Sequence, residues 1–120
     1  MGLPDDPQHR QALLIDLVSG AAAHLSLCPG IELRRLHAGA RVGLALHINR
    51  EALQARQLQT LLERRFEQAA IFDGCFVFLD AAGAVVIWHA ATLEGNTLDE
   101  TLNRILSLAK LDVLDRHANW

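Results

Sequence analysis

Histidine is the residue type in this sequence that is most suited to chemistry, because imidazole titrates near neutral pH and binds metal ions. The chain has six histidines: His9, His24, His37, His47, His89 and His117. None forms a spaced pair of the kind found in HExxH metal sites. His47 and His89 fall in predicted strands and could meet across a sheet. The pattern favours structural or surface histidines at both positions, and we expect no metal site.

The cysteines and turn carboxylates also favour a structural interpretation. Cys28 and Cys75 are 47 positions apart and form no CxxC or Cys/His cluster, which fits a reducing cytosol better than a disulfide framework or a zinc site. Cys75 is interpreted as a small buried hydrophobe. Asp73 and Asp80 each lie near a turn glycine, where aspartate is favoured because it hydrogen-bonds the local backbone.

Catalytic motifs such as GxSxG, GxGxxG and the P-loop do not occur in the sequence. A catalytic triad assembled in space is the alternative, since its members need not be neighbours in sequence. We therefore predict that the protein is not an enzyme and needs no cofactor.

Length and composition predict one folded domain. The chain has 120 residues, of which 51% are hydrophobic and 21% charged, and we expect a single domain over 1–120 with flexible ends at 1–6 and 116–120. Eleven basic residues against fourteen acidic ones argue against a nucleic-acid partner. The longest stretch without Asp, Glu, Lys or Arg, 17–31, is too short to span a bilayer, so the sequence predicts a cytoplasmic protein.

The first half of the chain predicts a helix, a hairpin and a second helix. Asp6 and Pro7 are a good helix start, and apolar residues at helical spacing extend the predicted helix over 7–27. Alternating residues then predict a hairpin with strands at 31–33 and 42–48. Asn49 can cap a second helix, whose predicted inward stripe is Leu58, Leu61, Leu62, Phe66 and Ala69.

The second half predicts another hairpin and a third helix. Apolar runs at 75–79 and 84–91 flank a four-residue turn, and both faces of this hairpin are apolar. A capping box beginning at Thr97 starts a helix expected over 97–115. The order α-ββ-α-ββ-α predicts an α+β fold, in which two hairpins form an antiparallel sheet and three helices pack on it.

The extra apolar face of the second hairpin predicts subunit association, because a monomer seldom exposes a large apolar patch. The candidate dimer interface consists of Phe76, Phe78, Val86, Trp88, Leu111 and Leu114. The alternative is that these residues fill one monomeric core.

The pattern resembles the class I type III secretion chaperones of the CesT/SycE type. The resemblance rests on the element order, on the strand VVIW (85–88) and on the capped helix TLDETLNRILSLAKL (97–111), and 61–111 is most similar to YscB-like members. It departs at one point: the family commonly has a third strand before the middle helix, where this sequence predicts two.

The resemblance implies a non-enzymatic chaperone that binds the extended N-terminal segment of a secreted effector or gatekeeper protein. It also implies a homodimer or a heterodimer with a second small chaperone. The candidate groove for the segment is Leu13, Leu17, Leu33 and Leu44, with plain core packing as the alternative. Two other functions remain open: a regulatory protein of the same secretion system that sequesters an activator, and a Roadblock-like scaffolding module.

Overall fold

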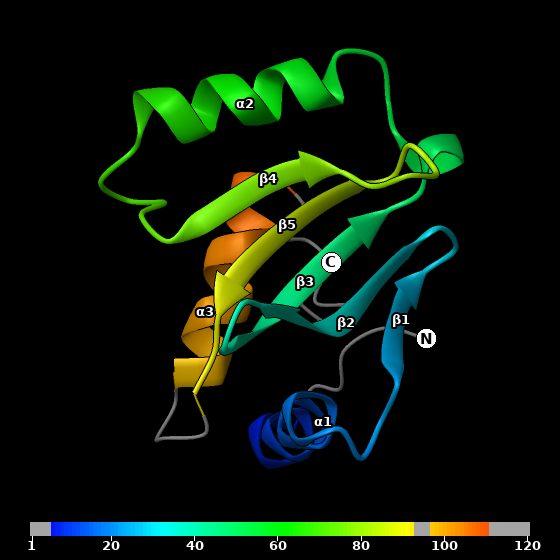
Figure 1. Ribbon diagram of the computed structural model, residues 1–120, viewed down its shortest axis with the longest axis vertical. Helices are drawn as coiled ribbons and strands as arrows, with labels where there is room; N and C mark the ends of the chain where they lie inside the picture. The colour runs from blue at the N-terminus through cyan, green and yellow to red at the C-terminus, as the bar shows by residue number, and fades with distance from the viewer. Residues whose placement is uncertain (1–5, 93–96, 111–120) are drawn as a thin grey trace.

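The chain forms an α+β fold, seen in a computed structural model that describes residues 6–92 and 97–110 (Figure 1). Five antiparallel strands have the spatial order β1-β2-β3-β5-β4. In chain order the elements are α1 (Pro7–Ser19), β1 (His24–Cys28), β2 (Ile31–Ala38), β3 (Arg41–Ile48), the short 3-10 helix η1 (Arg50–Ala52), α2 (Gln57–Glu67), β4 (Cys75–Leu79), β5 (Val85–Ala90) and α3 (Thr97–Leu108).

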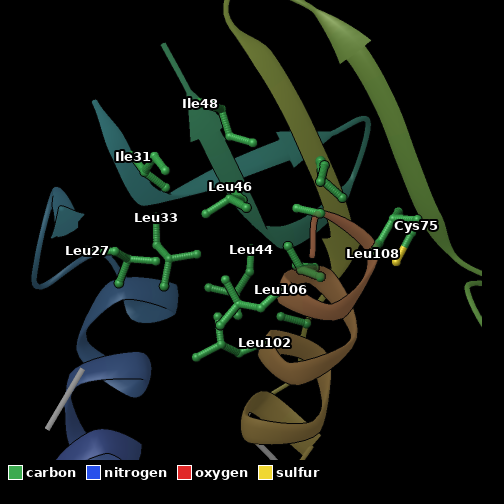
Figure 2. Close-up of a cluster of buried hydrophobic side chains, with 14 of the residues drawn as sticks. Leu27, Ile31, Leu33, Leu44, Leu46, Ile48, Cys75, Leu102, Leu106 and Leu108 are labelled. Carbon is green, nitrogen blue, oxygen red and sulfur yellow. The ribbon is translucent and has the colours of Figure 1, made fainter. Parts of the chain in front are cut away.

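Two helices cover one face of the sheet. α1 and α3 lie side by side beneath the strands, and leucines from the helices and the sheet meet between them (Figure 2). Leu33 and Leu46, which are opposite each other on β2 and β3, are fully buried there together with Leu102 of α3. α2 lies apart from these two helices, alongside the edge strand β4 (Figure 1).

The prediction that the first helix runs over 7–27 is wrong, although its start is confirmed. The Asp6 side chain accepts a hydrogen bond from the Gln8 amide, with Pro7 in the first turn. The helix ends at Ser19 because Gly20 adopts the left-handed conformation (φ 94°) that commonly terminates helices. The residues that follow form β1, so three strands rather than two precede α2.

The second predicted helix begins later than expected and has a different inner face. Asn49 leads into the 3-10 turn η1, and α2 starts at Gln57. Leu61 is buried as predicted, whereas Leu62, Phe66 and Ala69 are exposed. The predicted inward stripe is therefore correct at one position and wrong at these three.

Both predicted hairpins are confirmed, and so is the α+β class. β2 pairs with β3, and β4 pairs with β5 through a turn in which Asp80 Oδ1 accepts hydrogen bonds from the amides of Ala82 and Ala84, each at 2.9 Å. The third helix begins at Thr97 as predicted and ends at Leu108, while 111–115 lie outside the described residues. In the described part of the chain, no helix combines the length and the apolar character needed to cross a membrane.

Candidate protein-binding surface

The sheet face opposite α1 and α3 carries a second apolar cluster. Successive side chains of a strand point to opposite faces, so Ala45 of β3 and its neighbours Val86 and Trp88 of β5 face away from the main core. These three side chains are buried against one another, with Leu36 and Ala90 packed around them. No described helix lies on this face (Figure 1).

Trp88 organises the cluster by reaching across β3. Its Nε1 donates a hydrogen bond to the carbonyl oxygen of Leu36, at 2.8 Å. Gly43 makes this possible, because a Cβ at that position would lie 2.5 Å from Cε2 of the indole. On the other side, the ring of Phe76 packs on Trp88 with 5.8 Å between the centroids. The indole is thereby fixed in place, and its polar nitrogen is satisfied.

Two phenylalanines project from this cluster into solvent. Phe76 is 55% exposed and Phe78 42% exposed, although both are large apolar side chains. Together with Leu36 and Trp88 they border an open hollow of about 350 Å³, which His37, Ala38 and Arg41 complete. An exposed, mostly apolar hollow of this kind is typical of a surface that binds another molecule.

The structure brings together four of the six residues predicted to form a dimer interface. Phe76 is paired with Trp88, and Phe78 with Val86, across β4 and β5. Phe76 and Phe78 form the accessible part, while Val86 and Trp88 lie buried beneath them. The other two, Leu111 and Leu114, lie outside the described residues.

The four leucines of the predicted segment-binding groove lie elsewhere, under α1. Leu17, Leu33 and Leu44 are fully buried in the main core, as Figure 2 shows for the last two, and Leu13 is half-buried. A groove at these residues would require three side chains that are inaccessible in this structure, which corresponds to the alternative of plain core packing.

His47 lies at the polar end of the open face. It is 8% exposed, its cross-strand neighbours are Glu32 and Val86, and its Nδ1 is 3.9 Å from Oδ2 of Asp80. Burial lowers the pKa of the His47 imidazole, Arg34 lowers it further, and Asp80 and Glu32 oppose this change. The side chain is therefore neutral at pH 7.

The two strand histidines do not meet. His89 is on the opposite face from His47, with Nδ1 2.7 Å from the Ala90 carbonyl oxygen and Nε2 3.4 Å from Arg104. Among residues 6–92 and 97–110, no three histidine, cysteine, aspartate or glutamate side chains are grouped closely enough to hold a metal ion.

Cys75 is a buried core residue, as the sequence predicts. Its side chain packs among the leucines beneath the sheet (Figure 2). Burial raises the pKa of its thiol to about 11, and this outweighs the opposing effect of Arg104 and Arg65. A thiol with this pKa is almost fully protonated at pH 7 and is a poor nucleophile.

The sequence analysis missed a second exposed apolar surface, on α2. Leu62 is 46% exposed and Phe66 84% exposed, and Ile71 beyond the helix is exposed as well. All the strongly exposed large hydrophobic side chains in the described residues fall between Leu62 and Leu79. The missed signal is the pair of arginines Arg64 and Arg65, whose hydrogen bonds to backbone carbonyls determine which side of α2 faces inward.

Comparison with known proteins identifies one family. The family model described as HrpV-like matches residues 4–114 of the chain. Neither the curated proteins nor the solved structures include a match to it.

Proposed function

The chain belongs to the HrpV-like family, and we propose that it acts in type III secretion as a non-enzymatic regulatory protein that sequesters an activator. The family is associated with type III secretion, and HrpV is a regulatory protein of that system. This association supports a secretion role over the Roadblock-like scaffold. In this proposal the protein works in the cytoplasm, by protein contacts alone, and uses no cofactor.

The observation that carries the proposal is the exposure of Phe76 and Phe78 beside the hollow at Trp88. Interfaces concentrate their binding energy in aromatic residues and in the pockets next to them. The rigid sheet and the fixed indole provide a preformed surface, so little conformational entropy is lost in this chain on binding. We expect an apolar side chain of the activator to enter the hollow between Phe78 and Leu36.

A secretion chaperone is the second candidate, and the three strands before α2 favour it. The sequence predicted two strands there, which was the one departure from the class I chaperone order; β1 removes that departure. In this alternative the same face binds the extended N-terminal segment of a secreted protein, and the chain functions as a homodimer or with a second small chaperone.

A pull-down with two neighbouring variants tests the proposal. Phe78→Ser removes an apolar side chain from the open face. Leu79→Ser is the matched control, because Leu79 is 55% exposed and points to the other side of the same strand. Tagged full chains are expressed in the native bacterium with secretion induced, and retained proteins are identified by mass spectrometry.

We expect the wild type and Leu79→Ser to retain an activator of the secretion genes, and Phe78→Ser to lose at least tenfold of it, equivalent to about 1.4 kcal/mol. Retention of a secreted protein through its N-terminal segment would instead support the chaperone. If Phe78→Ser retains as much partner as Leu79→Ser, the open face is not the binding surface and the proposal is wrong.

A further inference from the structure

The outer side of α2 is an apolar surface that the sheet-face proposal does not use. Leu62 and Phe66 are four residues apart, so their side chains lie one above the other on the same side of the helix. They are 46% and 84% exposed. We propose that this stripe is the contact between two copies of the chain, which pair through antiparallel α2 helices.

The inner side of α2 is held firmly against the rest of the fold. Leu61 is buried beside the end of α3. The Arg64 guanidinium donates hydrogen bonds to the carbonyl oxygens of Ser107, at 2.9 Å, and Leu108, at 3.3 Å, and it also lies over the ring of Phe72. These contacts prevent α2 from rotating to bury Leu62 and Phe66 within its own chain.

A second contact fixes α2 along the sheet edge. Nε of Arg65 donates a hydrogen bond to the carbonyl oxygen of Cys75 in β4, at 2.8 Å. The helix therefore lies beside β4 and away from α1 and α3 (Figure 1). Its apolar stripe is presented on a rigid element, which favours association because few rotatable groups lose freedom there.

The charges at the two ends of α2 favour a second copy as the occupant. Arg56 directly precedes the helix, Glu67 is its last residue, and both are exposed. An antiparallel pair centred near Leu62 places Arg56 of each chain against Glu67 of the other, with the Leu62 side chains at the centre. It also aligns the two helix dipoles favourably. A parallel pair would place like charges together at both ends.

The size of the contact predicts a weak dimer. Stable interfaces bury about 800 Å² on each partner. A pair of helices with 11 residues each offers less than this, so we expect dissociation in the micromolar range.

Sedimentation velocity of the full chain across the micromolar range tests the pairing. We expect a concentration-dependent dimer for the wild type and a monomer for Phe66→Asp, whose exposed position should leave the circular dichroism spectrum and melting temperature unchanged. Phe78→Ser is the control, and it should still dimerise. A monomeric wild type overturns the inference. So does a dimer that survives Phe66→Asp, or one that Phe78→Ser disrupts, which would place association on the strand pair instead.

Charge reversal tests the antiparallel arrangement. Arg56→Glu and Glu67→Arg should each weaken the dimer about three- to tenfold, because each places like charges opposite one another. The double variant restores opposite charges and should return to within about twofold of the wild-type affinity. A double variant that is weaker than either single variant contradicts this geometry. Failure here leaves the regulatory proposal intact, because partner retention depends on Phe78 rather than on α2.

Discussion

The indole Nε1 of Trp88 and the carbonyl oxygen of Leu36 are joined by a hydrogen bond of 2.8 Å that passes over β3 at Gly43. Trp88 is on β5 and Leu36 is on β2, so one side chain ties together two strands that are not neighbours. The open face is held flat at this point, next to the hollow that we propose as the partner site.

Gly43→Ala should destabilise the fold, because the added Cβ would lie 2.4 Å from the His89 carbonyl oxygen and 2.5 Å from the Trp88 ring. Overpacking of this kind costs about 1–3 kcal/mol of unfolding free energy. Urea unfolding followed by circular dichroism measures the loss. In a Trp88→Phe background the same change should cost less, because the smaller ring relieves part of the clash; equal costs in both backgrounds would contradict this account.

Arg64→Met should destabilise the protein more than Arg65→Met. Arg64 donates to two carbonyl oxygens at the end of α3 and lies 5.4 Å from the centroid of Phe72, while Arg65 donates to one carbonyl. We expect a loss of about 2–3 kcal/mol for Arg64→Met and about 1 kcal/mol for Arg65→Met. Thermal and urea unfolding of the two variants measure the difference, and the reverse order would show that Arg64 does not hold α2 in place.

Stability should fall as the pH drops below 6.5. Burial and Arg34 lower the folded-state pKa of His47 from its ordinary value of 6.5, so the unfolded chain binds the proton more readily. The contribution of neutral His47 is complete above pH 6.5 and is lost as the pH falls through the folded-state pKa.

Comparison of variants isolates the His47 contribution from that of other titrating groups. The free energy of unfolding is measured at about pH 7.5 and about pH 5.5 for wild type, His47→Gln and the exposed-residue control His9→Gln. We expect a smaller difference between the two pH values in His47→Gln than in the other two. Identical differences in all three proteins would exclude His47 as a source.

Cys75 should resist alkylation in the folded protein. Its pKa of about 11 leaves roughly one thiol in a thousand ionised at pH 8, and the side chain is buried. A Cys28→Ser variant leaves Cys75 as the sole thiol, and mass spectrometry follows its reaction with iodoacetamide. We expect reaction at least a hundredfold faster in urea than in buffer; comparable rates would mean that this part of the core opens readily.

The hairpins could be predicted from sequence, because period-two alternation and turn residues are local signals. The end of α1 could not, because the leucines at 14, 17 and 25 also fit a helix that continues beyond Gly20. The left-handed conformation of Gly20 and pairing of β1 with β2 decide the matter. That pairing is a contact with a distant part of the chain, which helical periodicity does not report.

The candidate surface was predictable in part for the same reason. Phe76 and Phe78 alternate with the inward residues of β4, so the sequence alone indicates a second apolar face. The orientation of α2 depends on Arg64 reaching carbonyl oxygens 43 and 44 residues further along the chain. Helical periodicity places Leu62 and Phe66 on a stripe with Leu61, and only the distant contact shows that they face solvent.

The placement of α1 and α3 on one sheet face determines when this protein can finish folding. The Nε of Arg10 in α1 lies 3.0 Å from Oδ1 of Asp99 in α3, and Leu17 shares its core with Leu102. During synthesis, the first helix leaves the ribosome long before its neighbour has been translated. The nascent sheet therefore stays uncovered until translation is almost complete, and the newly made chain depends on its final helix to shield its oldest leucines from water.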